Sequence, residues 1–231
     1  MPALVGRGAT GVVLTGSHAR GGATGRSDLD LVIVGEGPGY LLRVCDDVLV
    51  SEAWAGEEAH RAEFSRPSEV GTSIPGWREG RILYDADGAA GRLKNEAQSW
   101  SWEDLCDRAD AWVAEELAGF AEEVQKLAAS LELGRKLVAA AQRDVLALRL
   151  ARVLAVHHRL LYGTENVLWE QVGERMGEEW RRAQDAAFGI DGESFEASCA
   201  AALSLFDLAA DCVASLLDER QAAVVGHARA R

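Results

Sequence analysis

Two aspartates and a glycine–serine pair stand close together near the N-terminus, between Gly16 and Val34. Asp28 and Asp30 open a short apolar strand, so their side chains point to one face and lie a few ångströms apart. Neighbouring carboxylates repel each other unless a cation lies between them, and Mg2+ binds one or two carboxylates together with substrate phosphates. Glycines let backbone N–H groups approach phosphate oxygens, and Ser17 adds a hydroxyl. The pattern predicts a site for a metal ion and a nucleotide.

An ordinary turn between two strands is the alternative, because Asp and Gly are common in turns. The context is narrower than that: an apolar strand leads into Gly-Ser, a glycine-rich loop follows, and Asp-x-Asp leads into a second apolar strand. This arrangement resembles the signature of the nucleotidyltransferase superfamily, which has the fold of DNA polymerase β. The resemblance implies a third carboxylate on a neighbouring strand.

Glu52 is the first candidate for that third carboxylate, because it lies in the middle of an apolar strand predicted over residues 48–54. A carboxylate among apolar residues usually needs a reason. Glu52 would equally fit the solvent face of an edge strand, and both interpretations stay open. Asp47, at the entry to the strand, is the second candidate.

The second half of the chain carries a closer resemblance. Residues 155–164, AVHHRLLYGT, are similar to a helix of the kanamycin (aminoglycoside 4′) nucleotidyltransferases, and residues 82–88 are similar to another segment of that family. With the first motif, the similarity is collinear over residues 12–175. Taken alone, His157 and His158 fit packing or surface positions better than ligand positions.

Counting back from these histidines, the resemblance places Glu122 on the general base of the family and Lys126 on a lysine that contacts nucleotide phosphates. Glu123 is the alternative base. On helical periodicity alone, Glu115, Glu122 and Lys126 form a solvated charged stripe. The resemblance also implies a nucleotide-binding set of Gly16, Ser17, Arg20, Ser27 and Lys126.

At three positions the sequence differs from the pattern of the aminoglycoside nucleotidyltransferases. Ala118 and Gly119 stand where the aminoglycoside enzymes have two acids that face the polyamine substrate, and Ser51 is nearest to the acid of the third strand. These departures leave nucleotidyl transfer as the expectation and weaken the specific expectation of an aminoglycoside acceptor.

Charge and composition limit the classes of molecule that the protein is expected to bind. The net charge is −13, from 37 acidic and 24 basic residues. A nucleic-acid duplex is not expected, because phosphate binding needs a basic face. An acidic protein attracts cationic small molecules. Four cysteines without metal-ligand spacing, no signal peptide and no run of ~20 apolar residues predict a cytoplasmic protein without a membrane segment.

Strand and helix patterns predict an α+β fold in two domains. Residues 1–95 carry four expected strands, at 12–15, 29–34, 48–54 and 81–84, a short helix at 57–64 and a loop at 67–76. This domain is expected to be a nucleotidyltransferase mixed-sheet domain. Residues 96–231 show helical spacing and predict a bundle that contributes to the acceptor site and to a dimer interface.

The expected function is Mg2+-dependent transfer of a nucleoside monophosphate from an NTP to a hydroxyl of a small, cationic acceptor such as an aminoglycoside. Asp28 and Asp30 are the predicted metal ligands, and Asp28, Asp30, Glu52 and Glu122 the predicted catalytic residues. The resemblance implies a homodimer. Two alternatives remain: a minimal nucleotidyltransferase of the toxin–antitoxin type, which modifies a protein or tRNA, and a homologue that binds nucleotide without turnover.

Overall fold

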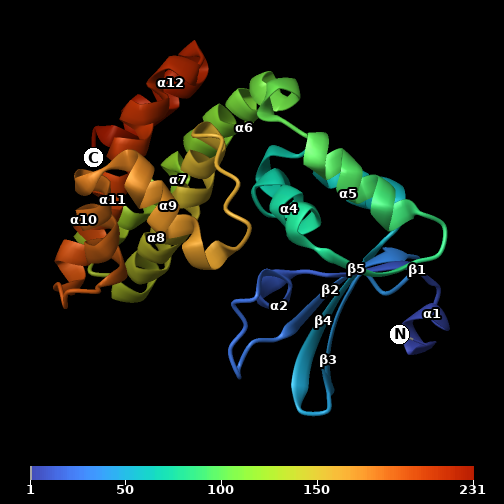
Figure 1. The fold of residues 1–231 in the computed structure, drawn as a ribbon. Helices are drawn as coiled ribbons and strands as arrows, with labels where there is room; N and C mark the ends of the chain where they lie inside the picture. Colours follow the sequence, from blue (N-terminus) through green and yellow to red (C-terminus); the bar gives the residue numbers. More distant parts are fainter. Residues whose placement is uncertain (1) are drawn as a thin grey trace. The chain divides into compact units, whose positions relative to one another are not determined.

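The computed structural model describes residues 2–231 and divides the chain into two compact units (Figure 1). The first unit ends at Trp102, and the second runs from Glu103 to Arg231. In the described residues, all strands belong to the first unit, and the second unit consists of helices and their connections. The fold is therefore α+β, a mixed sheet followed by a helical unit, as predicted.

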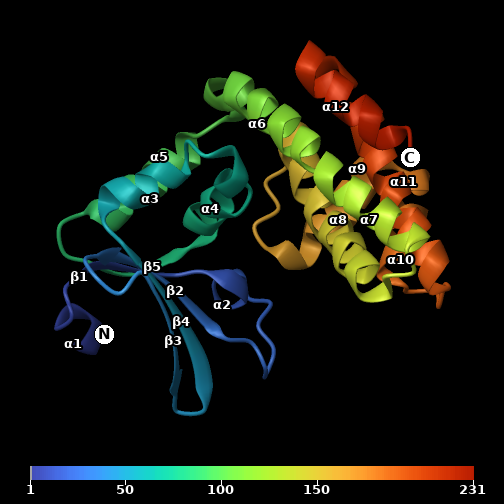
Figure 2. The ribbon, with the colours of Figure 1, turned by 180° about the vertical axis from the view of Figure 1, so that it is seen from behind.

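The sheet has five strands in the order β3-β4-β2-β1-β5 (Figures 1 and 2). Strands β2 and β4 are parallel, and the other neighbouring pairs are antiparallel. The central position of β2 places its first residues between the end of β1 and the start of β4. The strands are β1 (Ala9–Leu14), β2 (Leu29–Gly35), β3 (Tyr40–Cys45), β4 (Val48–Ala55) and β5 (Arg81–Asp85).

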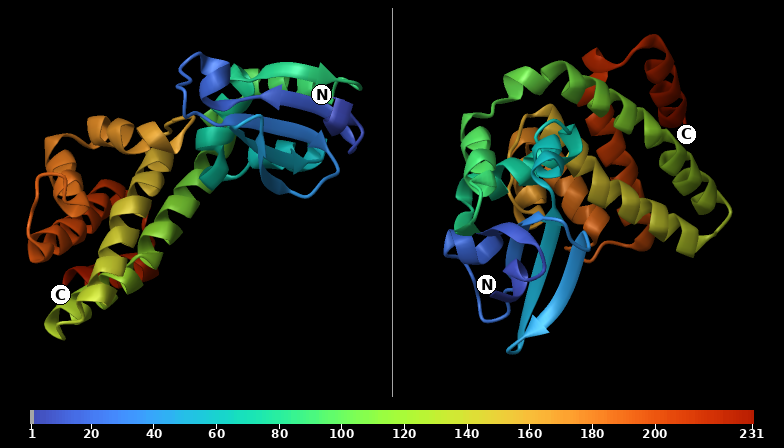
Figure 3. Two further views of the ribbon diagram at one scale, coloured as in Figure 1. Left: turned by 90° about the horizontal axis from the view of Figure 1, so that it is seen from below. Right: turned by 90° about the vertical axis from the view of Figure 1, so that its right-hand side faces the viewer.

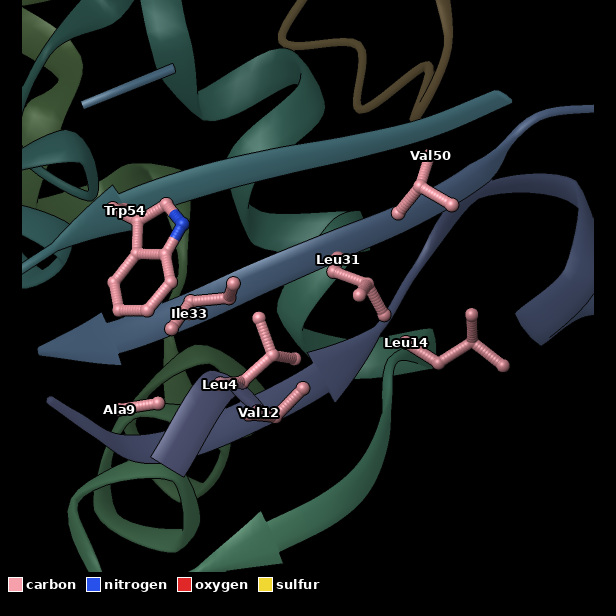
Figure 4. Close-up of a cluster of buried hydrophobic side chains, with 8 residues drawn as sticks. All are labelled: Leu4, Ala9, Val12, Leu14, Leu31, Ile33, Val50 and Trp54. Atoms are coloured by element: carbon pink, nitrogen blue, oxygen red, sulfur yellow. The ribbon is translucent and has the colours of Figure 1, made fainter. Parts of the chain in front are cut away.

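One face of the sheet carries an apolar core (Figure 4). Alternate strand residues share a face, and the pairing of Val12 with Ile33 and of Leu14 with Leu31 brings the apolar members of β1 and β2 together. The one-turn helix α1 (Pro2–Val5) adds Leu4 to this face. The buried cluster consists of Leu4, Ala9, Val12, Leu14, Leu31, Ile33, Val50 and Trp54.

Three helices lie on the side of the sheet opposite α1 (Figure 2). They are α3 (Glu57–Glu63), α4 (Pro67–Glu79) and α5 (Ala89–Ser99). A Cβ atom added to Gly11 of β1 would lie 3.2 Å from Cβ of Ala90, so α5 packs directly on the strand. Arg78 ties α4 to α5, because its Nε donates to the Ala97 carbonyl at 2.7 Å.

The four predicted strands are confirmed, but two other elements differ from the prediction. Strand β3 was not predicted. Residues 67–76 form most of α4, so the predicted loop is wrong. Pro67 occupies the first turn, where a missing N–H costs little, and Pro75 stands inside the helix. Burial of Val70, Ile74 and Trp77, each at most 3% exposed, offsets the lost hydrogen bond of Pro75.

The helical unit is built around α8, which packs against α7 and α11 (Figure 3). Glu115, Glu122 and Lys126, expected to form one charged stripe, are divided between α6 and α7, because the helix is interrupted at Phe120. The helices are α6 (Cys106–Gly119), α7 (Ala121–Glu132), α8 (Lys136–His157), α9 (Leu168–Met176), α10 (Glu178–Phe188), α11 (Phe195–Val213) and α12 (Glu219–Arg229), with 3-10 turns at Trp102–Leu105, Glu165–Val167 and Ala214–Leu216.

One segment, Phe195–Leu216, is long and apolar enough to span a membrane by length and composition, with a mean hydropathy of 1.6. This differs from the expectation that no segment comes close to that length. A core helix of a bundle passes the same test, so one such helix is weak evidence for a membrane span. Here α11, which makes up most of the segment, packs against α8 and α10.

Candidate functional site

The glycine–serine pair lies where β1 leads into a short helix, α2 (Gly16–Arg20). The backbone N–H of Thr15 donates to the carbonyl of Asp30 at 2.9 Å, which joins this turn to the start of β2. Gly16 has a φ of 65°, and a Cβ added to it would lie 2.0 Å from Oδ2 of Asp30. Glycine is therefore required here by both backbone conformation and close approach.

Asp30 is held from its other side by Ser51 of β4. The parallel register pairs Asp30 with Ser51, and the Ser51 hydroxyl donates to Oδ1 of Asp30 at 2.7 Å. Ser51 is 8% exposed, whereas Asp30 keeps a partly exposed side chain. One carboxylate oxygen thus accepts a hydrogen bond, and the other faces the backbone at Gly16.

Asp28 directly precedes β2 and is partly exposed. Among residues 2–231, its carboxylate has no hydrogen-bond or ion-pair partner, and no basic side chain pairs with Asp30. Two carboxylates without a protein cation match the ligands that Mg2+ takes from a protein when phosphates complete its coordination. The residues present therefore fit a divalent metal ion.

Glu52 is not placed beside these aspartates, and this corrects the prediction. In the register, Glu52 pairs with Leu31, so its side chain points to the apolar-core face, opposite Asp30 and Ser51. The solvent-face interpretation also fails, because Glu52 is 0% exposed and β4 is an inner strand. Glu52 accepts hydrogen bonds from the side chains of Arg7 at 2.9 Å, Arg43 at 2.5 Å and Trp54 at 3.0 Å.

These contacts determine the protonation state of Glu52. Burial raises the pKa of Glu52, but the hydrogen bonds from Trp54, Arg43 and Arg7 together outweigh burial and leave the pKa below its ordinary value. The group is thus a buried, ionised carboxylate with two basic partners, which is a structural arrangement and not an open metal site.

Asp47 does not supply the third carboxylate beside Asp30 either. Asp46 and Asp47 form the two-residue turn between β3 and β4, with φ values of 49° and 62°. Positive φ at both positions matches a type I′ hairpin turn, in which Asp is tolerated. Asp47 precedes Ser51 by four residues, or about 13 Å along an extended strand.

Arg20 and Ser27 have partners within the first unit. Nη1 of Arg20 lies 3.6 Å from a carboxylate oxygen of Glu79 in α4. The Ser27 hydroxyl accepts from the backbone N–H of Thr24 at 2.9 Å and closes the turn that leads to Asp28. Ser27 therefore shapes the approach to the aspartates, and its role toward a nucleotide stays a prediction.

Glu122 and Lys126 lie in the first turns of α7 in the helical unit, where their side chains form an ion pair at 2.6 Å. Both are exposed, at 71% and 47%. The hydrogen bond from Lys126 lowers the pKa of Glu122, and the same bond raises the pKa of Lys126. Glu123 is partly buried on the same turn, so both candidates for the base remain.

Ser51 was not predicted as a site residue from its own sequence context. The family resemblance nevertheless placed it nearest to the acid of the third strand. The signal lies in strand alternation: Val50, Glu52 and Trp54 share one face, and the two apolar members mark that face as the core. Ser51 must then point the other way, toward Asp30.

Comparison with known proteins agrees with this architecture. The family described as the nucleotidyltransferase domain matches residues 4–77, which hold both aspartates, Gly16, Ser17 and Ser51. A nucleotidyltransferase-like protein from Exiguobacterium sibiricum 255-15 has a similar structure, with a TM-score of 0.55 and 14% sequence identity over 93% of this chain and 71% of its own. No curated protein matches the chain. The match and the shared fold support a nucleotidyltransferase superfamily domain in the N-terminal unit.

Proposed function

We propose that the chain transfers a nucleoside monophosphate from an NTP to a hydroxyl of a small acceptor, with Mg2+ held by Asp28 and Asp30. The observation that carries the proposal is the placement of Asp30: one oxygen lies against the backbone at Gly16, and the other accepts from Ser51. This fixes one carboxylate at a strand start beside Asp28, which has no partner of its own among residues 2–231.

The chain's own residues then have separate tasks. Ser51 holds the Asp30 carboxylate in one orientation, and the backbone N–H groups and the Ser17 hydroxyl at the Gly16–Ser17 turn are the proposed phosphate contacts. Arg20 and Lys126 are the proposed cationic contacts of the triphosphate. Mg2+, when bound, would neutralise the negative charge that develops on the reacting phosphate. The acceptor oxygen attacks the α-phosphorus in line, the bond to the β-phosphate breaks, and pyrophosphate leaves.

The base that takes the acceptor proton must come from elsewhere, because Ser51 stands beside Asp30 where a third carboxylate is expected. We assign this role to Glu122 of the helical unit, with Glu123 as the alternative. The hydrogen bond from Lys126 lowers the pKa of Glu122, which keeps the carboxylate ionised but also makes it a weaker base.

For the acceptor we propose a cationic small molecule, an aminoglycoside or a related amino sugar, acted on in the cytoplasm by a homodimer. The net charge of −13 supports this choice, because an acidic surface concentrates cations. The same charge disfavours tRNA as acceptor.

Nucleotide binding without turnover is the second candidate, and one observation favours it. Glu52 is turned to the core and bound by two arginines, so β4 adds no carboxylate to Asp28 and Asp30. A protein that binds Mg2+ and NTP needs no more than this pair.

The test is pyrophosphate release with Mg2+ and each NTP across a panel of aminoglycosides, for the wild type, Asp28→Asn and Asp30→Asn. Asp46→Asn is the matched control, since Asp46 lies in the hairpin turn and Asn tolerates its positive φ. Acceptor-dependent release that is lost in both site variants and kept in the control supports catalysis. NTP binding that needs Mg2+ and Asp30, without release with any acceptor, supports the binding function instead.

A further inference from the structure

A cluster of nitrogen and sulfur ligands lies in the helical unit, apart from the residues assigned above. His157 ends α8, and His158 follows it directly. Cys212 lies in the last turn of α11, and Met176 is the last residue of α9. Three helix ends thus bring two imidazoles, a thiol and a thioether to one place, although these residues are far apart in the sequence.

The possible ligand atoms of this cluster lie close to one another. One nitrogen of each histidine and Sγ of Cys212 all lie within 4.8 Å of one another. Nε2 of His158 is 3.8 Å from Sγ of Cys212 and 3.2 Å from Sδ of Met176. A tetrahedral Zn2+ with ordinary bond lengths holds its N and S ligands about 3.6 Å apart. Small side-chain rotations would therefore bring the three groups to coordination distance.

A neutral imidazole offers a metal ion the lone pair of one ring nitrogen. Nδ1 of His157 is buried and has no hydrogen-bond partner among the described residues. Such an atom is costly unless a ligand satisfies it.

The backbone around the histidines is fixed independently. Arg159 follows them with a φ of 58°, an uncommon conformation for a non-glycine residue. Its guanidinium donates to Oδ1 of Asp110 in α6 at 2.6 Å and to the Val156 carbonyl at 2.8 Å. These contacts hold the backbone that carries the two imidazoles in one geometry.

We propose that His157, His158 and Cys212 form a binding site for a transition-metal ion of the Zn2+ class, which links the end of α8 to α11. Two imidazoles and a thiolate are ligands that such an ion prefers over Mg2+. The thiol proton of Cys212 must leave when the S–metal bond forms. The site is separate from the proposed Mg2+ ligands and stands without the proposed function.

The experiment uses the full chain, stripped of metal with a chelator and kept reduced, and titrates it with Co2+ as an optical probe and with Zn2+ by calorimetry. The variants are Cys212→Ser and His158→Gln. Cys199→Ser is the matched control, because Cys199 lies buried on the same helix outside the cluster.

We expect one ion per chain, a thiolate-to-Co2+ charge-transfer band that Zn2+ abolishes, and a rise in Tm on adding Zn2+. Binding should weaken by at least the ~10–100-fold that loss of a supporting partner costs in Cys212→Ser and His158→Gln, and persist in Cys199→Ser. Absence of the charge-transfer band in the wild type would overturn the proposal, whether or not the variants fold. So would Zn2+ binding that is equally tight in folded Cys212→Ser.

Discussion

At the scale of single residues, the contact between Gly16 and Asp30 controls the candidate site. Gly16 has no side chain at the point where Asp30 approaches the backbone most closely, and its φ of 65° belongs to the left-handed region. Gly21, at the end of the same short helix, also has a positive φ, of 77°, but a Cβ there would meet nothing within 4 Å. Substitutions at Gly16 and Gly21 can therefore separate the cost of a positive φ from the cost of a steric clash.

We expect Gly16→Ala to abolish Mg2+-dependent NTP binding and to destabilise the fold by ~1–3 kcal/mol, because the new methyl group displaces the Asp30 carboxylate. Gly21→Ala should cost only ~1 kcal/mol of left-handed strain and keep NTP binding. Urea unfolding and nucleotide titration measure the two effects. Equal NTP affinity in the two variants would show that the close approach at Gly16 does not matter for binding.

Glu52 gives a second prediction at this scale. Replacing Glu52 by Gln leaves Arg7 and Arg43 without their carboxylate and should lower the free energy of unfolding at pH 7 by about 2–3 kcal/mol. Glu58→Gln, at a position 87% exposed, should change it by less than about 0.5 kcal/mol.

The effect of Glu52 should also depend on pH. Because the pKa of Glu52 is lower in the folded than in the unfolded protein, its contribution is complete above the ordinary value of 4.5 and is lost as the pH falls below that value. The difference between wild type and Glu52→Gln, measured by urea unfolding from pH 7 to pH 3, should shrink accordingly. A difference that stays constant over this range would contradict the ionised state of Glu52.

The sequence was sufficient to locate Asp28, Asp30, Gly16 and Ser17, because the whole motif lies within one continuous segment that runs from β1 through α2 to β2. It was not sufficient for Glu52, whose orientation depends on the register between β2 and β4 and on two arginines from other segments. A buried carboxylate among apolar residues fits a catalytic group and a buried ion pair equally well. Only the side chains that bind the carboxylate distinguish these two roles.

At the scale of elements, hydrophobic patterns predicted most strands but missed helices and edges that depend on tertiary contacts. β3 exposes Tyr40, Leu42 and Val44 along an edge of the sheet, so its alternation is not the polar–apolar alternation of a half-buried strand. Two prolines and two glycines in α4 led to the prediction of a loop. The segment is nevertheless helical, because the helix buries its apolar side. Local propensity is a weak guide in both cases.

Helix α12 begins with a capping box that was not predicted from the sequence. Its N-cap residue Asp218 accepts from the backbone N–H of Gln221 at 2.7 Å, and Oε1 of Gln221 accepts from the backbone N–H of Asp218 at 3.0 Å. Gln221 also donates to Glu115 of α6 at 3.0 Å. The reciprocal pair begins the helix, and the bond to Glu115 attaches it to α6.

We expect Asp218→Ala to destabilise α12 by ~1 kcal/mol, because an N–H of its first turn loses its acceptor. Amide hydrogen exchange should accelerate in residues 219–229, with much smaller changes in α8. Glu219→Ala, one residue on and outside the reciprocal pair, should change exchange only slightly. Uniform acceleration across the helical unit would indicate that the cap supports more than this one helix.

At the scale of the whole molecule, the net charge of −13 is the property with the widest effect. If the acceptor is a polycation, long-range attraction contributes to its capture, and salt screens that attraction, since the Debye length falls from ~10 Å at 0.1 M to ~3 Å at 1 M. The KM for the acceptor should therefore rise as NaCl increases over this range.

Initial rates of pyrophosphate release at several NaCl concentrations check this prediction. The control is the same acceptor with its amino groups acetylated, whose KM should change little because it carries no positive charge. A KM that rises equally for the charged and the acetylated acceptor would mean that the acidic surface serves solubility and not capture.

The contact between Arg7 and Glu52 has a practical consequence for handling the protein. Residues Pro2–Val5 form one helical turn, and Arg7 then supplies a counter-ion to a carboxylate that is 0% exposed. Aminopeptidase trimming past residue 7 would therefore do more than shorten a terminal arm, because it would leave a buried charge with one basic neighbour fewer. A preparation clipped in this way would migrate almost normally on a denaturing gel, yet it would unfold at a lower urea concentration.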